Sequence, residues 1–350
     1  MRTRRTARTL LTLTTAVLLL APTAGLAAAQ GSSDRSGGSA HSTGKGSGHH
    51  HPGRPDPRPT SYLLDPADQA AEDVFPEGVA VHRDTFYVGS TTDGTIYRGS
   101  LDEPVATPFL LGGEDGRTSA IGMKADGRTL FVAGGATGLV FAYDVRTREL
   151  VGSWQVAQTG EPTFLNDIAI SPRGDVYVTD SMRPALYRID ARDRRTDGVA
   201  ELPVFVDFTG TVLEYQPGFN VNGIVVSQDG KHLVVAQSNT AELFRVTIAD
   251  RSVAQVDLGG EAVSGDGLVL QGRTLYAVER QGDVGYIVKI DLSRGLAAGT
   301  VVSRTTDPSF NDPTTAALAG RSLLVVNSQF GERAAGVEPG PFTVSRVPAP

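Results

Sequence analysis

Six polar or charged residues recur at similar long intervals along the chain and could together bind a metal ion. They are Glu77, Ser119, Asn166, Asn222, Asp266 and Thr314. Successive members lie 42, 47, 56, 44 and 48 residues apart, and each stands at the head of a short apolar run. If these runs are equivalent strands that converge on one axis, the six side chains face one small polar space.

The two carboxylates and two carboxamides of this set predict a calcium site. Calcium takes about six to eight oxygen ligands at about 2.3–2.6 Å, and carboxylate and amide oxygens both serve. Glu77, Asn166, Asn222 and Asp266 would supply four of them and leave places for water and a substrate oxygen. Mg²⁺ and Mn²⁺ are less favoured alternatives. Zinc is disfavoured because the chain has no cysteine and because His82 and His232 lie outside these positions.

Turn chemistry offers a simpler explanation for part of this pattern. Asn222-Gly223 and Asp266-Gly267 are ordinary turn dipeptides when each is taken alone. Glu77 is a poor turn residue, yet it occupies the same position of the repeat. The shared register therefore favours a common site over six unrelated turns.

The elements that would position these residues are copies of one strand pair. Self-similarity at a period of about 40 to 50 residues is typical of propellers and solenoids. Each copy has an apolar run, a turn that usually contains glycine, and a second apolar run that ends in a small or polar residue. The copies begin at Pro76, Ser119, Leu165, Val221, Gly265 and Pro313.

Further runs extend most copies to four strands. In ALYRIDA, Tyr187 and Ile189 alternate with Arg188 and Asp190, which is the period-2 pattern of a strand with one buried face. The sequence thus predicts an all-β fold, a six-bladed β-propeller with a central tunnel. We expect TSYLLDP near Thr60 and PFTVSRVPA near the carboxyl end to close the ring as strands of one shared blade.

The amino-terminal segments predict export. Residues 1–29 combine four arginines, an apolar run and a final Ala27-Ala28-Ala29, the order found in a secretory signal peptide. Residues 30–60 are rich in Gly, Ser, Pro and His, which predicts a disordered linker. The propeller is expected over residues 61–350. We expect a secreted, extracellular protein, and the sequence leaves the Sec and twin-arginine routes open.

Charge argues against two classes of partner. Beyond residue 60 the chain has 24 basic and 37 acidic residues, a net charge of −13 against −7 for the whole chain. Nucleic acid and anionic membranes are therefore disfavoured. We expect a monomer that binds a small-molecule substrate.

The leading residues of the copies resemble those of a known family. PEG at Pro76, ND at Asn166, NG at Asn222 and DG at Asp266 are similar to the senescence marker protein and gluconolactonase (LRE-like) family of calcium-dependent propellers, related to diisopropyl fluorophosphatase and paraoxonase. The resemblance implies a catalytic calcium held by Glu77, Asn166, Asn222 and Asp266, with Asp167 beside it. It also implies hydrolysis of lactones or phosphoesters.

The same resemblance gives candidate substrate-binding residues. Some relatives carry Arg-x-Asn in the second blade, and this chain has Arg117-Thr118-Ser119 there, a departure that puts sugar specificity in doubt. We predict that Arg117, Ser119 and Thr314 contact the substrate. Histidines of the paraoxonase type are missing.

The nucleophile remains open at this stage. Calcium polarises a carbonyl or phosphoryl oxygen but acidifies bound water less than zinc does, so another group must activate the attack. Glu77, Asp167 and Asp266 are the candidate catalytic residues; Asp266 or Glu77 could be a general base, and Asp266 could be a covalent nucleophile. The predicted function is a calcium-dependent lactonase or esterase. A non-catalytic ligand- or protein-binding propeller with a structural calcium is the alternative.

Overall fold

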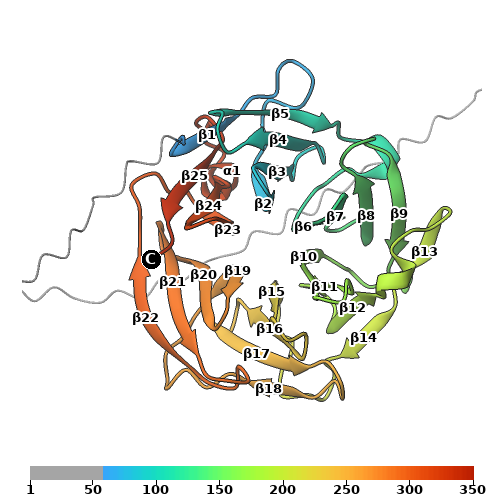
Figure 1. The fold of residues 1–350 in the computed structure, drawn as a ribbon, viewed down its shortest axis with the longest axis vertical. Coiled ribbons are helices and arrows are strands. Elements are labelled where there is room, and N and C mark those ends of the chain that lie inside the picture. Colours follow the sequence, from blue (N-terminus) through green and yellow to red (C-terminus); the bar gives the residue numbers. More distant parts are fainter. Residues whose placement is uncertain (1–57) are drawn as a thin grey trace, which may run out of the picture. The chain divides into compact units, whose positions relative to one another are not determined.

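Residues 58–350 form a ring of twisted sheets around a central axis, as the computed structural model in Figure 1 shows. The structure describes these residues only. The predicted signal peptide and nearly all of the predicted linker lie outside the described residues. Within residues 58–350 no helix is long and apolar enough to cross a membrane.

The ring is almost entirely β-structure, and its strands form five hydrogen-bonded sheets. The largest sheet has the order β2-β3-β4-β5-β1-β25-β24-β23, with β1 (Ser61–Leu64), β2 (Pro76–His82), β3 (Thr85–Ser90), β4 (Ile96–Ser100), β5 (Val105–Leu110), β23 (Pro313–Ala319), β24 (Ser322–Asn327) and β25 (Thr343–Pro348). The next has the order β13-β9-β8-β7-β6, with β6 (Met123–Asp126), β7 (Thr129–Ala133), β8 (Leu139–Asp144), β9 (Leu150–Gln155) and β13 (Val199–Glu201).

Three four-stranded sheets complete the ring. They comprise β10 (Leu165–Ile170), β11 (Val176–Asp180), β12 (Ala185–Ile189) and β14 (Val204–Asp207); β15 (Val221–Val226), β16 (His232–Gln237), β17 (Glu242–Thr247) and β18 (Val253–Gln255); and β19 (Gly265–Gln271), β20 (Thr274–Gln281), β21 (Val284–Leu292) and β22 (Gly299–Thr305). The described helices are short: η1 (Glu114–Gly116), η2 (Ala191–Asp193) and α1 (Phe330–Ala335).

The predicted strand pairs form as antiparallel hairpins. Between β10 and β11 the chain turns at Ser171, whose N–H donates to the carbonyl of Asp175 over 2.8 Å. Gly174 takes a φ of 91° in that turn, which a side chain would disfavour. In β12 Tyr187 is buried whereas Arg188 is half-buried, as the alternation predicts.

Both ends of the described chain close the ring together. Strand β1 pairs antiparallel with β25, with Tyr62 opposite Val344, and parallel with β5, with Leu63 opposite Val105. The predicted closing strands are therefore confirmed. Pairing distant ends of the chain leaves no open gap in the ring.

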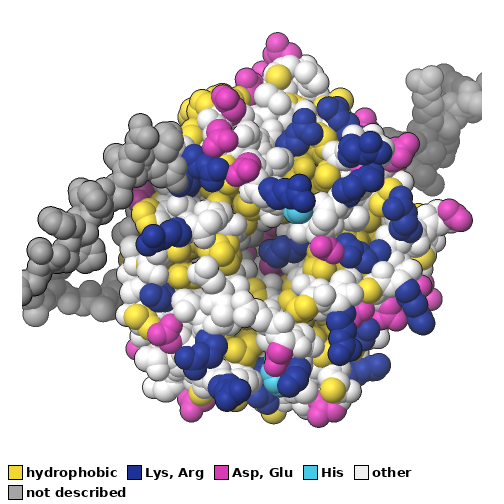
Figure 2. Space-filling model, in the orientation of Figure 1, with side chains coloured by type: hydrophobic (Ala, Val, Ile, Leu, Met, Phe, Trp, Pro, Cys, Tyr) yellow, Lys and Arg dark blue, Asp and Glu magenta, His cyan; other side chains and the backbone are white. Residues whose placement is uncertain are grey.

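The inner strands meet around the axis and enclose the centre of the ring (Figure 1). Contacts run from β2 to β6, β6 to β10, β10 to β15, β15 to β19, β19 to β23 and β23 back to β2. The apolar core lies between neighbouring sheets; Phe131 and Trp154, for example, belong to one buried cluster with Ile168 and Val178. Figure 2 shows one face of this ring, hollowed at its centre, with basic and acidic side chains interspersed around it.

A β-bulge recurs at the head of most inner strands. The pairing register shifts between Pro76 and Val79, Leu165 and Ile168, Val221 and Ile224, Gly265 and Leu268, and Pro313 and Ala316. A bulge inserts unpaired residues and redirects their side chains. The residues inside these bulges include five of the six residues at the predicted shared position.

A glycine inside the bulge lets neighbouring inner strands approach closely. A Cβ on Gly78 would lie 2.1 Å from the carbonyl oxygen of Ile121, and one on Gly223 would lie 2.1 Å from that of Asp266. The same contact corrects the predicted register in the second copy. Gly122 is the equivalent glycine, so Ile121 occupies the shared position, and Ser119 lies two residues earlier.

Candidate metal centre and substrate cavity

A cavity of about 370 Å³ lies at the end of the axis where the inner strands begin. We call it the head cavity. Its lining residues are Glu77, Thr91, Ser119, Ile121, Phe164, Asn166, Phe219, Asn222, Asp266, Phe330 and Arg333. The structure thus brings together the four residues predicted to hold a metal, from strands β2, β10, β15 and β19.

Three oxygen atoms of this cavity are buried and have no hydrogen-bond partner. They are Oε2 of Glu77, Oδ1 of Asn166 and Oδ1 of Asp266. An unsatisfied buried polar atom costs about 1–3 kcal/mol, and more when the group is charged. Three such atoms from three strands on one cavity wall indicate a missing electropositive partner.

The remaining polar atoms of these side chains are held in place by neighbours. The hydroxyl of Thr315 donates to Oε1 of Glu77 over 3.3 Å. The amide nitrogen of Asn166 donates to Oγ of Ser181 over 2.9 Å, and that hydroxyl donates to the carbonyl of Val221. These contacts orient the side chains of Glu77 and Asn166 so that one oxygen of each stays unpaired.

Burial and mutual repulsion disfavour negative charge in the cavity. Burial raises the pKa of Glu77 well above its usual range, and the negative charges of Asp266 and Asp167 raise it further. Burial also raises the pKa of Asp266 to about 7, although a hydrogen bond from Asn222 favours its ionised form. A cation between these carboxylates would reverse both shifts.

The atoms present fit a hard cation. All the candidate ligands are oxygens, two of them from carboxylates, and this composition suits calcium better than zinc. Within residues 58–350 no group of three or more His, Cys, Asp or Glu side chains is placed to hold a metal. A metal held by Glu77 and Asp266 therefore needs further oxygen ligands, and the side-chain amides of Asn166 and Asn222 lie in the same lining.

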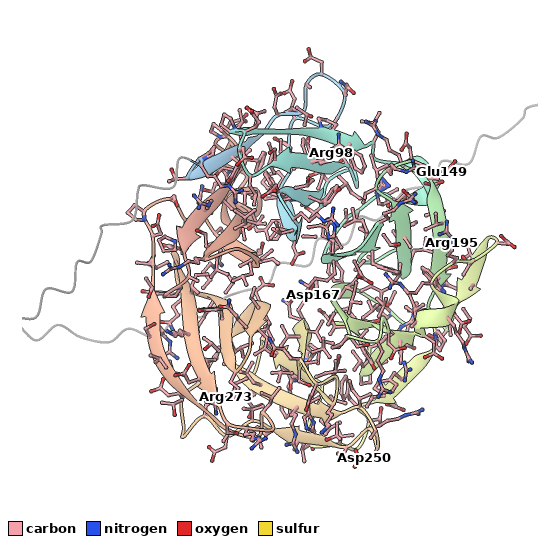
Figure 3. All side chains as sticks on the ribbon, viewed as in Figure 1. Arg98, Glu149, Asp167, Arg195, Asp250 and Arg273 are labelled. Carbon is pink, nitrogen blue, oxygen red and sulfur yellow. The ribbon has the colours of Figure 1, made fainter. Side chains whose placement is uncertain are left out.

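Asp167 does not line the head cavity. Its Oδ1 accepts the backbone N–H of Ile168 over 2.7 Å, and its Oδ2 accepts that of Ile224 over 3.3 Å. Lys124 Nζ lies 3.8 Å from Oδ1. Figure 3 shows Asp167 near the centre of the ring beside β10. Since both oxygens are engaged, this carboxylate joins β10 to β15, and it lies outside the lining that holds the other two candidate catalytic residues, Glu77 and Asp266.

The predicted substrate-binding residues separate in the structure. Ser119 lines the head cavity, but Arg117 and Thr314 do not. Arg117 is fully buried and donates to the carbonyls of Gly94 and Leu111 and to the hydroxyl of Tyr143. Its guanidinium is satisfied by structural contacts. Thr314 is also buried, and its hydroxyl donates to the backbone carbonyl of Glu77 over 3.1 Å.

Six lining residues were not predicted from the sequence, namely Thr91, Ile121, Phe164, Phe219, Phe330 and Arg333. Phe164, Phe219, Phe330 and Arg333 come from segments outside the repeated strand pairs. The repeat pattern gives no register for such segments. The one available signal was an aromatic residue shortly before Asn166 and another shortly before Asn222.

Comparison with known proteins identifies the fold. No protein-family model matches the sequence, and no curated protein matches it. The chain is similar in structure to the allergen Mala s 1 of Malassezia sympodialis, at 14% identity and a TM-score of 0.58, covering 83% of this chain and 96% of that one. It is also similar to a protein provisionally named a gluconolactonase, at 13% identity and a TM-score of 0.53, covering 83% and 94%.

A third similar structure is a streptogramin B lyase, at 12% identity and a TM-score of 0.53, covering 76% of this chain and 79% of that one. The gluconolactonase-like protein and the lyase are β-propellers. This chain is a β-propeller. Identities this low establish the fold and do not establish the activity.

Proposed function

We propose that this protein is a calcium-dependent hydrolase of small esters or lactones, a six-bladed relative of the gluconolactonase-like propellers. The observation that carries the proposal is the set of three unpartnered buried oxygens on Glu77, Asn166 and Asp266. The inner strands β2, β6, β10, β15, β19 and β23 would each begin one blade. Export as a monomer, with residues 1–29 as signal peptide, 30–60 as linker and 61–350 as propeller, is part of the same proposal.

Glu77, Asn166, Asn222 and Asp266 would hold the calcium ion. When bound, the ion would supply a Lewis acid that polarises the carbonyl oxygen of the substrate. Glu77 is buried, and a charge interaction with a buried carboxylate is stronger than one in bulk water. Ser181 and Thr315 keep the liganding side chains in one orientation.

Asp266 is our candidate for the general base. It is only partly buried, whereas Glu77 is almost fully buried and accepts a hydrogen bond from Thr315. Asp266 would take a proton from the attacking water as the oxygen of that water bonds to the carbonyl carbon. The bond to the leaving oxygen then breaks, and the proton returns to that oxygen, giving an acid and an alcohol.

A ligand-binding propeller is the second candidate. One observation favours it: Asp167 is engaged by Ile168, Ile224 and Lys124 and lies outside the lining of the cavity. If Glu77 and Asp266 are both committed to the metal, no further carboxylate of the lining is left to act as base.

One experiment separates the two candidates. Calcium stoichiometry by calorimetry should give one ion in the cavity, with turnover measured on a panel of lactones, aryl esters and phosphotriesters. Calcium-dependent turnover that Glu77→Gln removes supports the hydrolase. One bound calcium without turnover of any member supports the binding protein. Full activity after exhaustive calcium removal would contradict the proposed function.

A further inference from the structure

The rim of the head cavity carries a specific arrangement of aromatic and basic side chains. Phe219 is half exposed. Among residues 58–350 it is the only aromatic residue with an exposed large hydrophobic side chain. Its ring meets that of Phe164 edge to face, with centroids 4.9 Å apart. An aromatic pair with one exposed ring and one half-buried ring at a cavity mouth is typical of a ligand contact.

A buried asparagine fixes the loop that presents Phe219. Oδ1 of Asn220 accepts the N–H of Gln216 over 2.7 Å and the side-chain amide of Gln237 over 3.0 Å. Nδ2 of Asn220 donates to the carbonyls of Gln216 and Gly218, each over 2.8 Å. The aromatic wall is therefore held in advance of binding, which lowers the entropy cost of contact.

Arg333 supplies a positive charge from another part of the rim. It lies in α1, donates to the hydroxyl of Thr91 over 3.1 Å and stacks over the ring of Phe75 at 5.0 Å. No Asp or Glu among residues 58–350 forms an ion pair with it in the structure. The contacts with Thr91 and Phe75 hold the guanidinium in place, and no described carboxylate neutralises its charge in an ion pair.

The two features lie on different sides of the axis. Phe164 and Phe219 stand just before β10 and β15, whereas Arg333 and Thr91 follow β24 and β3. Figure 1 places β10 and β15 across the centre of the ring from β23 and β2. A ligand in the cavity can thus touch an aromatic wall with one part and Arg333 with another.

Few polar groups remain for the body of a ligand. Four polar residues of the lining belong to the proposed calcium site, and the hydroxyl of Thr91 is already bound to the carbonyl of Phe75. Ser119 and Arg333 are left, beside Ile121 and three phenylalanines. A polyhydroxylated sugar would need more hydrogen-bond partners than these.

We infer that the head cavity selects aromatic esters or lactones that carry one negative charge away from the reacting carbonyl. The inference concerns the same cavity as the proposed function and rests on it. Phe164 and Phe219 bind the ring, and Arg333 binds the anion by a charge-assisted hydrogen bond. A volume of about 370 Å³ suits a ligand of this size.

The test compares phenyl acetates that carry a para-carboxylate or a para-carboxamide. We expect wild type to prefer the carboxylate by about tenfold in kcat/KM, since one ordinary charged contact changes affinity by about that factor. Arg333→Gln should bring the ratio close to one. Arg273→Gln is the matched control, because Arg273 is exposed in the turn after β19, away from the head of that strand (Figure 3). It should leave the ratio unchanged.

A second pair of variants tests the aromatic wall. Phe219→Ala should raise KM for both esters about tenfold and leave their ratio unchanged. The control Val302→Ala removes an equally exposed apolar side chain from β22 and should leave both KM values unchanged. Circular dichroism and the Tm report whether each variant folds.

The corresponding unreactive acetanilides separate this inference from the proposed function. If no ester is turned over but the acetanilides bind with an Arg333-dependent preference for the carboxylate, the ligand class stands and the hydrolase fails. If the esters are turned over without a charge preference, the hydrolase stands and the ligand class is wrong. A wild-type ratio near one in both assays, no binding of either acetanilide, or a ratio that Arg333→Gln leaves intact overturns the inference.

Discussion

The same inner strands line two cavities of different chemistry, one at each end of the axis. The head cavity holds Glu77, Asn166, Asn222 and Asp266. The second, which we call the tail cavity, has a volume of about 290 Å³. It is lined by Val79, Ala80, Val81, Lys124, Ala125, Ala169, Ile170, Ile224, Val225, Val226, Leu268, Val269, Leu270, Ala316, Ala317 and Leu318.

The strand ladders explain the contrast between the two cavities. Toward the tail, pairing is regular, as between Val79 and Val88 or Ile224 and Val235. At the head, the register shifts and the bulged residues turn toward the axis. In the regularly paired part of each strand, apolar side chains pack on the next sheet. A bulged residue is unpaired, so its side chain need not pack there and can be polar. The candidate metal ligands therefore lie where the hydrogen-bonded pairing of the inner strands is interrupted.

The largest difference between the cavities should appear in turnover. Glu77→Gln and Asp266→Asn keep the shape of each side chain but remove its charge, so each should lower kcat/KM by about 10³-fold or more. Val226→Ala trims the tail cavity and should change kcat/KM by less than about threefold. Steady-state kinetics on an aryl ester measures all three. Equal losses at both ends would show that general destabilisation, rather than the head site, controls activity.

The second difference should appear in the pH dependence of stability without calcium. The folded-state pKa of Asp266 is about 7, above its unfolded value, because of burial, and that of Glu77 is raised in the same direction. The stability due to such a raised pKa is fully present below about pH 4 and is lost as the pH rises through 7. For Asp266 alone the full loss between pH 4 and 8 is about 4 kcal/mol, of which about 3 kcal/mol falls between pH 5 and 8.

Chemical denaturation from pH 5 to 8 measures this effect. The carboxylates whose pKa is lowered, such as Asp250, contribute constant stability in this range. Burial lowers the pKa of His232, which acts with the opposite sign, but it acts equally with and without calcium. The calcium-free curve should fall with pH and the calcium-saturated curve should not. Parallel curves would contradict a cation between the two carboxylates.

The third difference concerns the backbone contact that holds the bulges together. Gly78→Ala would place a methyl group 2.1 Å from the carbonyl oxygen of Ile121, so neighbouring inner strands must move apart. We expect a loss of about 3 kcal/mol in the free energy of unfolding. Gly331→Ala is the control, because its Cβ would meet nothing closer than 3.7 Å and should change stability by less than about 1 kcal/mol. A Gly78→Ala variant as stable as the control would contradict close packing between neighbouring inner strands at their bulges.

The sequence predicted the repeated strand pairs and the alignment of most of their leading residues. Each copy must bury the same face against the next sheet, so the apolar pattern recurs and aligns Glu77, Asn166, Asn222 and Asp266. The second copy was misaligned because Ile121, an apolar residue, occupies its shared position and gives no polar signal. The glycine that approaches its neighbour, Gly122, was the better marker of register.

The repeat pattern could not predict the positions of residues outside the repeated strand pairs. Arg117 looked like a substrate ligand because the sequence does not show that Gly94, Leu111 and Tyr143 satisfy its guanidinium. Arg333 reaches the head cavity from α1, a helix in the connection between β24 and β25. Such contacts depend on loop conformations that vary from blade to blade.

The smallest expected effect is on calcium affinity. It concerns a residue that holds a proposed calcium ligand in place without being a ligand itself. Ser181→Ala removes the acceptor for the amide of Asn166, so that side chain can rotate its oxygen away from the cavity. Loss of a supporting contact of this kind typically weakens metal binding by about 10- to 100-fold. We expect calcium affinity to fall by about tenfold, with one ion still bound at saturation, whereas Ser171→Ala, in the turn at the tail end of β10, should leave affinity unchanged. Calcium titration by calorimetry decides: unchanged affinity in Ser181→Ala would mean that Asn166 is not a ligand or needs no support, and complete loss of binding would make Ser181 itself part of the site.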